Sequence, residues 1–314
     1  MNFKEKLLRK ERSWTDILLL VFIQAYLWMQ LGGFLGQMVF HIDKWGYLFT
    51  SNADIAADIG TYLLSLGFCY SIPLGLLVFK KNRKLLKVLS PEKKTAIVSG
   101  SVLGLASGFA LNAAIVAGAV LTGSLTFTSG SVQILPLIGY LIAILFQAGG
   151  EELICRMFIM GKLRRRYKSP VVAIVGNCLF FTIFHLGNPG ITAASILGVF
   201  AAGIMFSLIV YYSENIWIAI GMHTAWNFTQ TILFGLPNSG MSAPYSVFKA
   251  EKATSGLCFD AGFGVEGSWA AVIAIGLVIT AILLISRKRG AQSSLSADVR
   301  KETCVAELSQ AEGC

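Results

Sequence analysis

The sequence carries little charge for its length. Only 14% of its 314 residues are charged, 55% are hydrophobic, and the mean hydropathy is +0.67. A soluble domain usually has about 25% charged residues. Because the apolar residues come in long blocks, these values exclude an ordinary soluble enzyme and predict a polytopic membrane protein. The length suits one compact bundle better than two domains.

The sequence also lacks the signatures of several classes of membrane protease and metal site. It has no HExxH motif, which excludes a zincin-type site, and no paired aspartates inside its apolar segments. The serines in SGS (99–101) and NSG (238–240) do not resemble the setting of a rhomboid-type nucleophile. There is no CxxC pair, so neither a disulfide framework nor a zinc knuckle is expected. The six scattered cysteines are Cys69, Cys155, Cys178, Cys258, Cys304 and Cys314.

Positive charge is in excess but gathers in short connections. The formal net charge is +9, and no basic stripe alternates with aromatic residues, so no nucleic-acid partner is expected. The basic stretches alternate along the chain with neutral or acidic ones, which predicts a multi-pass protein of the cell membrane with both termini in the cytoplasm. The basic stretches are the N-terminus, 80–94, 162–168 and 287–289.

Eight apolar segments predict an all-α, polytopic membrane helical bundle of about eight transmembrane helices. The segments are 14–40, 58–79, 95–122, 132–161, 170–187, 191–213, 215–235 and 268–286. The expected organisation is a basic cytoplasmic N-terminus (1–13), N-terminal transmembrane helices (14–130), a catalytic transmembrane core (132–235), an extracytoplasmic loop (236–267), a last transmembrane helix (268–286) and a disordered cytoplasmic tail (287–314).

Glycines at four-residue spacing predict close helix contacts. Gly100, Gly104 and Gly108 form one such row, and Gly32 and Gly36 form another. Small residues on one helix face let two backbones approach closely in a membrane. We therefore interpret these rows as packing faces.

The stretch QAGGEELICRMFIM places charge inside an apolar segment. An ionisable group at membrane depth costs about 2.5–3.5 kcal/mol, so it needs a partner, a cavity or a function. Residues four apart share a helix face, which predicts an ion pair between Glu152 and Arg156. Glu151 is turned by about 100° from Glu152, and its i+4 neighbour is the uncharged Cys155. The alternative, that these charges only lock the helix to a neighbour, stays open for Glu152 and Arg156.

Two later segments each place a histidine and a second polar or aromatic residue on one helix face. In FFTIFHLGNPG, Phe181 and His185 are four residues apart. In AIGMHTAWNFTQ, His223 and Asn227 are four apart, and Gln230 continues the same stripe. A His/Asn pair inside an apolar segment predicts a functional site.

Counting along the predicted helices places Glu151, His185 and His223 where all three can meet within a hydrocarbon core about 30 Å thick. A buried carboxylate can act as general base toward water. One histidine can share that water, and His223 with Asn227 can donate hydrogen bonds to a developing oxyanion. The same carboxylate and histidines can instead hold a divalent metal such as zinc, with water in the open position. The residues leave both options open.

The three motifs together resemble the CPBP family of membrane proteases (CAAX protease and bacteriocin-processing), which includes the Rce1-type and Abi-like proteins. The family pattern is EExxxR, then FxxxH, then HxxxN, and the order and spacing match here. The matching residues are Glu151, Glu152, Arg156, Phe181, His185, His223 and Asn227. The resemblance covers about residues 132–235.

The resemblance implies an eight-helix intramembrane fold with a cavity open to the cytoplasm. It implies that Glu151 activates water with help from His185, and that His223 and Asn227 stabilise the oxyanion. Its members are described as metalloproteases, for which the metal ligands here would be Glu151, His185 and His223, although a metal-free glutamate mechanism is also argued. Supporting positions would be Glu152, Arg156 and Phe181.

The expected substrate is a peptide or a lipidated protein, as for the family members that cut prenylated tails. An alternative function is a non-catalytic membrane scaffold or a bacteriocin self-immunity protein, as other members are. A proton-coupled transporter is a further alternative, because carboxylates and histidines can relay protons. The sequence shows no inverted repeat to favour a transporter, and it leaves the oligomeric state open.

Overall fold

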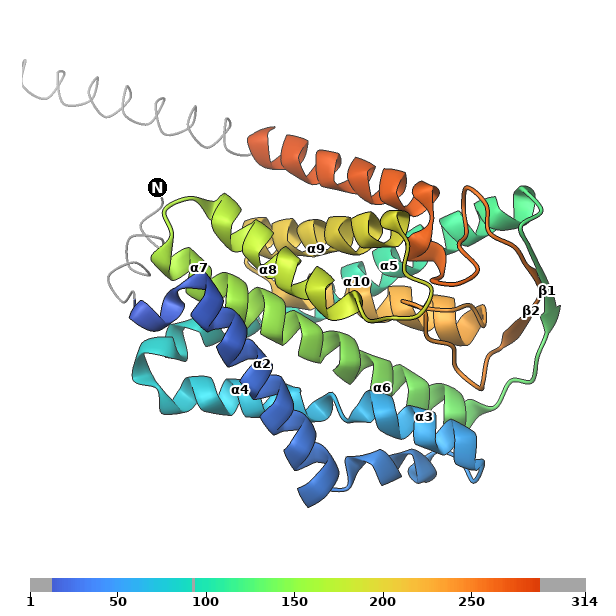
Figure 1. Ribbon diagram of the computed structural model, residues 1–314, viewed down its shortest axis with the longest axis horizontal. Helices are drawn as coiled ribbons and strands as arrows, with labels where there is room; N and C mark the ends of the chain where they lie inside the picture. The colour runs from blue at the N-terminus through green and yellow to red at the C-terminus, as the bar shows by residue number, and fades with distance from the viewer. Residues whose placement is uncertain (1–12, 92–93, 289–314) are drawn as a thin grey trace, which may run out of the picture.

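The computed structural model describes residues 13–91 and 94–288. The predictions for the basic residues 1–12 and for the tail after 288 lie outside these residues. Long helices make up the described part, and a two-stranded sheet lies at one end of the bundle (Figure 1). An all-α helical bundle, as predicted, is confirmed.

The longer helices follow the apolar segments. They are α2 (Leu18–Phe34), α3 (Ala53–Leu63), α4 (Leu66–Val78), α5 (Thr95–Leu121), α6 (Ile134–Glu152), α7 (Met160–Arg166), α8 (Pro170–His185), α9 (Ala193–Ser213), α10 (Ile216–Phe228) and the final helix Trp269–Lys288. Three π-helical segments continue a preceding helix: η2 (Leu35–Val39), η5 (Leu153–Ile159) and η6 (Thr229–Leu233). Short 3₁₀ segments are η1 (Trp14–Asp16), η3 (Ile42–Leu48), η4 (Lys80–Leu89) and η7 (Val265–Gly267).

Six helices are long and apolar enough to cross a membrane among the residues described. They are Leu18–Val39, Ala53–Val78, Thr95–Leu121, Ile134–Arg166, Ala193–Ser213 and Trp269–Lys288. Two further predicted segments form shorter helices: α8 has 16 residues, and α10 has 13 before it continues into η6. The count of eight therefore stays a prediction.

The fourth predicted segment ends too early at residue 161. Helix continues through α7 to Arg166, so most of the predicted basic connection 162–168 is helical. Lys162 and Arg165 are buried there, and the Arg165 guanidinium donates to both carboxylate oxygens of Asp16, at 2.6 and 2.7 Å. Lys162 Nζ donates to Gln24 at 2.6 Å. The charges are satisfied by α2 and the segment before it, which hydropathy along one helix does not reveal.

The second predicted segment, 58–79, begins too late. Helix α3 begins at Ala53, because the side chain of Asn52 accepts a hydrogen bond from the backbone N–H of Ile55 and caps the first turn. Part of the stretch 41–57, which lies between the first two predicted segments, is therefore helical. Similar side-chain caps begin α8 at Ser169, α9 at Thr192 and α10 at Asn215.

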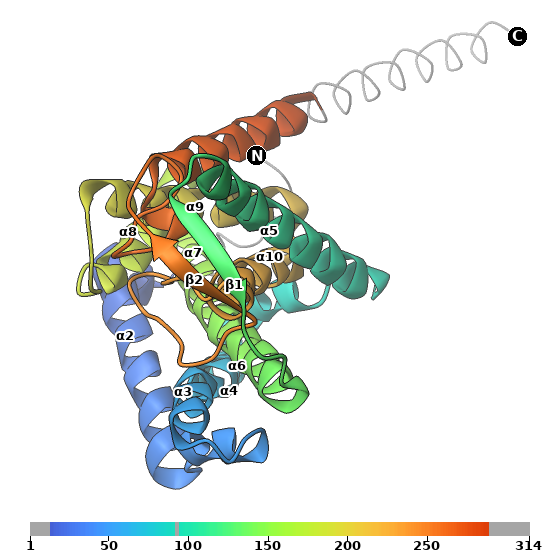
Figure 2. The same ribbon diagram turned by 90° about the vertical axis from the view of Figure 1, so that its right-hand side faces the viewer.

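The expected loop 236–267 contains regular structure that the sequence analysis did not predict. Strand β2 (Phe248–Ala253) pairs antiparallel with β1 (Leu125–Ser129), which follows α5. Figure 2 shows the two strands lying across the end of the bundle. The sheet ties the chain after η6 to the chain between α5 and α6.

The glycine row of α5 packs against α10, as the spacing predicts. A Cβ on Gly104 would lie 2.3 Å from the carbonyl oxygen of Ile218, and one on Gly108 would lie 2.2 Å from that of Met222. In the other row, a Cβ on Gly32 would lie 2.7 Å from the backbone of Gly67 in α4. Close approach of α5 positions α10, which carries the His/Asn motif.

Candidate active site

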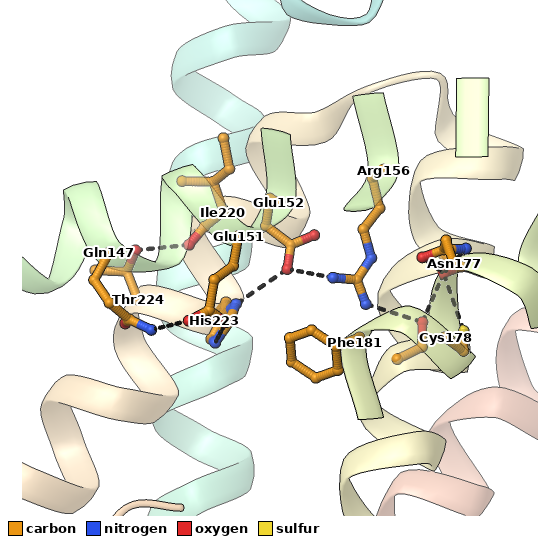
Figure 3. A network of polar contacts seen from close by, with 12 residues as sticks. Gln147, Glu151, Glu152, Arg156, Asn177, Cys178, Phe181, Ile220, His223 and Thr224 are labelled. Atoms are coloured by element: carbon orange, nitrogen blue, oxygen red, sulfur yellow. Dashed lines mark hydrogen bonds and ion pairs between the residues drawn. The ribbon is translucent and has the colours of Figure 1, made fainter. Parts of the chain in front are cut away.

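Glu152 stands between a guanidinium and an imidazole inside the bundle (Figure 3). Its Oε1 accepts from Arg156 Nη1 at 2.9 Å, and His223 Nδ1 lies 3.0 Å from the same oxygen. Glu152 and Arg156 are fully buried side chains. The predicted i,i+4 ion pair is present, and it also connects α6 to α10.

Aromatic rings enclose the Arg156 guanidinium. The guanidinium carbon lies 5.0 Å from the ring centroid of Phe181 and 5.3 Å from that of Phe206, and Nη2 donates to the carbonyl oxygen of Gly203 at 3.1 Å. The His223 ring stacks on Phe206 with centroids 5.2 Å apart. These contacts partly replace the water that the charged group loses on burial.

Glu151 has different surroundings from its neighbour. Its side chain remains 26% exposed, and its Oε2 lies 3.8 Å from His223 Nε2. Its Oε1 accepts a hydrogen bond from Gln147, one helical turn earlier. Gln147 Oε1 in turn accepts from Asn227 Nδ2 at 2.9 Å. Gln147 therefore links the Glu151 carboxylate to α10, the helix that carries His223 and Asn227.

His185 ends α8 with one ring nitrogen engaged. Its Nδ1 lies 2.8 Å from the carbonyl oxygen of Phe181, so a proton on Nδ1 makes this bond. The ring packs beside Phe181 with centroids 4.6 Å apart. Nε2 is then the nitrogen that carries the lone pair.

The motif side chains line a cavity of about 180 Å³. All four residues predicted as catalytic contribute to it: Glu151, His185, His223 and Asn227. Phe181 also lines it, whereas Glu152 and Arg156 do not. Apolar walls come from α9 and the final helix through Val199, Ala202, Met205, Phe206 and Ile275. The arrangement places a carboxylate, two imidazoles and an amide around one partly apolar space.

Two of the π-helical segments lie at the motifs: η5 contains Arg156, and η6 begins two residues after Asn227. Segment η5 begins after Glu152, and η6 begins after Phe228, the residue that follows Asn227. Single π turns inside helices occur often at functional sites, because the wider turn shifts the side chains that follow. Here the segments lie on the two facing elements that carry the motifs.

The side chains do not form a three-ligand metal set. Over residues 13–91 and 94–288, no group of three His, Cys, Asp or Glu side chains is placed to hold a metal ion. His223 Nδ1 faces Glu152, His185 Nδ1 faces a carbonyl, and Glu151 accepts from Gln147. These contacts engage Nδ1 of each histidine and Oε1 of Glu151, and they leave the Nε2 atoms and Glu151 Oε2 for other partners. The predicted ligand set of Glu151, His185 and His223 stays a prediction.

Several polar residues that line the cavity were not predicted from the sequence, namely Gln147, Asn188, Asn238, Ser239 and Glu266. Gln147 lies four residues before Glu151, so the same helical spacing that pairs Glu152 with Arg156 would have identified it. Ser239 and Glu266 come from the expected loop, where no periodic pattern marks them. Tertiary folding alone brings them to the cavity.

Glu266 is buried at the end of the cavity nearest the loop. Its carboxylate accepts from Gln230 Nε2 at 2.5 Å and from the backbone N–H of Ser239. Gln230 Oε1 accepts from Asn112 Nδ2 at 2.9 Å, so the carboxylate is joined to α5. Burial raises the pKa of Glu266, and the hydrogen bonds to the carboxylate act in the opposite direction.

Comparison with known proteins locates the similarity in the same helices. Residues 133–229 match the family model described as Rce1-like, type II CAAX prenyl endopeptidase Rce1-like. No curated protein and no solved structure matches the chain. The matched residues include all seven motif positions, and the match supports a membrane protease of the CAAX endopeptidase class. The chain thus carries an Rce1-like segment over residues 133–229, which confirms the family resemblance that its three motifs predict.

Proposed function

We propose that this protein is an intramembrane endopeptidase that hydrolyses a peptide bond with a water molecule activated by Glu151. The proposal is supported by a difference in burial between the two adjacent carboxylates, Glu151 and Glu152. Glu152 is fully buried between Arg156 and His223, whereas Glu151 is partly exposed and lines a cavity with both motif histidines. A base must reach its water. Glu151 Oε2 is itself buried and has no hydrogen-bond partner in the described structure, so it is the oxygen left to take a proton from a water in the cavity.

In the proposed reaction, Glu151 accepts a proton from water as the water oxygen attacks the scissile carbonyl carbon. The neutral tautomer of His185 with its proton on Nδ1 presents a lone pair on Nε2, which accepts the second hydrogen of that water. The tetrahedral intermediate then collapses, the C–N bond breaks, and the proton held by Glu151 passes to the leaving amine. One water is consumed, and a carboxyl group and an amine result.

The oxyanion would be stabilised by His223 and Asn227. The carboxylate of Glu152 accepts at Nδ1 of His223, which fixes the ring orientation. For Nε2 to donate to the oxyanion, His223 must then carry a proton on each nitrogen. Asn227 Nδ2 donates to Gln147 at 2.9 Å, and it would exchange this bond for one to the oxyanion. Such donors are worth about 10²–10³ in rate when they act in a site that excludes water.

A divalent metal would act as a Lewis acid and activate water if one were bound. The candidate ligands would be Glu151, His185 and His223, and the steps above are written for the side chains alone. Cleavage measured with and without a chelator tests the alternative. Loss of activity on chelation, with recovery on adding one divalent ion, would replace the metal-free scheme.

The central experiment is a substrate-trapping search with the Glu151→Gln variant. Peptides or proteins enriched on this variant are then offered to the purified wild type, to Glu151→Gln and to His185→Ala. We expect wild-type cleavage and a loss of at least about 100-fold in both variants, since general acid–base catalysis contributes about 10²–10⁴.

The matched control is Glu251→Gln, which neutralises an exposed carboxylate on β2 outside the cavity. It should cleave like the wild type. Equal cleavage by Glu151→Gln and wild type would refute the proposed base. A phenotype that survives Glu151→Gln while no substrate is enriched would instead favour a non-catalytic scaffold or immunity protein.

A further inference from the structure

One wall of the cavity comes from a helix outside the segment that matches the family model. Tyr62, on α3, lines the cavity together with the motif residues, whereas the matched segment begins only at residue 133. Among the described residues, it is the one lining side chain that precedes this segment. Its hydroxyl is therefore a polar group of the cavity that the three motifs do not supply.

The ring of Tyr62 is held by an anchored neighbour on α6, which lies beside α3 (Figure 1). It packs edge to face against the ring of Tyr140, with centroids 6.4 Å apart and planes at 74°. Tyr140 is fully buried, and its hydroxyl donates to Oδ2 of Asp58 at 2.8 Å. Asp58 lies one helical turn before Tyr62, so α3 supplies the ring and also fixes the residue against which the ring packs.

The face of α6 that Tyr62 meets also carries the proposed base. Gln147 and Glu151 follow Tyr140 by seven and eleven residues, which places them about two and three turns farther along the same helix face. The negative charge of Glu151 acts electrostatically on the Tyr62 hydroxyl, and both side chains line the cavity. Tyr62 and Glu151 therefore stand on adjoining walls of one space.

The Tyr62 hydroxyl makes no hydrogen bond to any residue that the structure describes. The same is true of Oε2 of Glu151 and of Nε2 of His185. The carboxylate oxygen is an acceptor, Nε2 is an acceptor when the imidazole proton is on Nδ1, and a phenolic hydroxyl is a donor. One donor and two acceptors around a polar space are a set that a single water molecule can satisfy, because such a water usually makes about three hydrogen bonds.

We propose that the Tyr62 hydroxyl holds the hydrolytic water by donating a hydrogen bond to the water oxygen. The two hydrogens of this water then point to Glu151 and His185, one lone pair accepts from Tyr62, and the other lone pair faces the scissile carbonyl carbon. Tyr62 keeps its own proton throughout, so the proton transfers of the proposed reaction are unchanged. This inference rests on the proposed endopeptidase function, to which it adds a water-positioning residue from outside the matched segment.

The test compares Tyr62→Phe with wild type on a peptide that the Glu151→Gln variant has enriched. The substitution removes only the hydroxyl. We expect kcat to fall by about 10-fold with KM unchanged, because the lost hydrogen bond orients the attacking water and does not hold the peptide. The unfolding temperature should equal that of wild type, since the hydroxyl bonds to no described residue of the folded chain.

The matched control is Tyr70→Phe. The Tyr70 hydroxyl is also without a hydrogen-bond partner among the described residues, but Tyr70 does not line the cavity. This variant should cleave like the wild type. Wild-type kcat in Tyr62→Phe overturns the proposal, and so does a change confined to KM, because the hydroxyl would then bind the peptide. A lowered unfolding temperature with unchanged kcat would assign the hydroxyl to the fold and overturn the proposal as well.

A second measurement separates a role toward the water from a role toward the oxyanion. In the His185→Ala background the water has already lost one of its partners, so adding Tyr62→Phe should change the residual rate by less than about 2-fold. Losses that multiply would show that the two side chains act independently, as they would if Tyr62 donated to the oxyanion, and would overturn the water-positioning role.

The Glu151→Gln variant is measured in the same assay. Cleavage that survives Glu151→Gln refutes the proposed base and with it this inference. Loss of cleavage in Glu151→Gln, together with full activity in Tyr62→Phe, refutes this inference alone and leaves the proposed function standing.

Discussion

The Nδ1 atom of His223 lies 3.0 Å from Oε1 of Glu152, across the contact between α10 and α6. The same oxygen accepts from Arg156, so one buried carboxylate orients an imidazole and neutralises a guanidinium. Two of the three sequence motifs meet in this contact. Its removal therefore affects stability and chemistry together, which separates Glu152 from Glu151.

Glu152→Gln should lower both stability and activity. Without the carboxylate charge, the Arg156 guanidinium stays buried and unpaired, and breaking a buried ion pair in this way costs about 3–5 kcal/mol. Thermal unfolding of the detergent-solubilised protein measures the loss. Glu151→Gln is the matched variant: it should unfold within about 1 kcal/mol of wild type, because the side chain is partly exposed and the amide oxygen still accepts from Gln147. Similar unfolding of the two variants would contradict the assigned division.

Gln147→Ala should reduce kcat and leave KM nearly unchanged. Gln147 holds Glu151 and accepts from Asn227, so its loss misplaces the base without removing it. Misplacement by about 1 Å can cost about 100-fold in rate, and we expect a fall of about 10- to 100-fold. Steady-state kinetics on a trapped peptide substrate measure this. Gln133→Ala, at an exposed position before α6, serves as the control; an effect confined to KM would argue against positioning.

Gly104→Ala should destabilise the protein although alanine favours helix. The added Cβ would lie 2.3 Å from the carbonyl oxygen of Ile218, so α5 and α10 must separate. Overpacking of this kind costs about 1–3 kcal/mol. Gly33→Ala, whose Cβ meets nothing within 4 Å, should be neutral or slightly stabilising. The comparison is made by unfolding temperature, and equal temperatures for the two variants would disprove the close contact.

Stability should depend on pH through Glu266. Because burial raises its pKa in the folded state, the folded protein keeps this proton at pH values where the unfolded chain has lost it. The resulting stabilisation is complete below about pH 4, the ordinary value for glutamate, and is lost as the pH rises through the raised folded value.

The measurement compares unfolding temperatures of wild type and Glu266→Gln from about pH 4 to pH 8. The wild type should lose stability relative to the variant as the pH rises. Glu251→Gln, which neutralises an exposed carboxylate, should run parallel to the wild type. A wild type that gains stability over Glu266→Gln with rising pH would show that the hydrogen bonds outweigh burial.

Several features were predictable because they depend on neighbours along the chain. Hydropathy predicted the bundle, and four-residue spacing predicted the Glu152–Arg156 pair and the packing face of Gly104. The residues at which helices end were harder to predict, as α7 shows by continuing to Arg166. From the sequence, Arg165 is predicted in a connecting loop. In the structure it is buried, because it pairs with Asp16, 149 residues away.

The sequence by itself determined the helical, membrane-spanning class and the identity of the three motifs, since periodicity and spacing are local properties. Only the tertiary structure decided that Gln147 holds Glu151, that Glu266 joins the cavity through Gln230, and that Tyr62 lines the cavity. These outcomes depend on which elements pack together and on how deeply each carboxylate is buried. Neither the packing partners nor the burial of a carboxylate can be predicted from local sequence, because both depend on the assembled bundle.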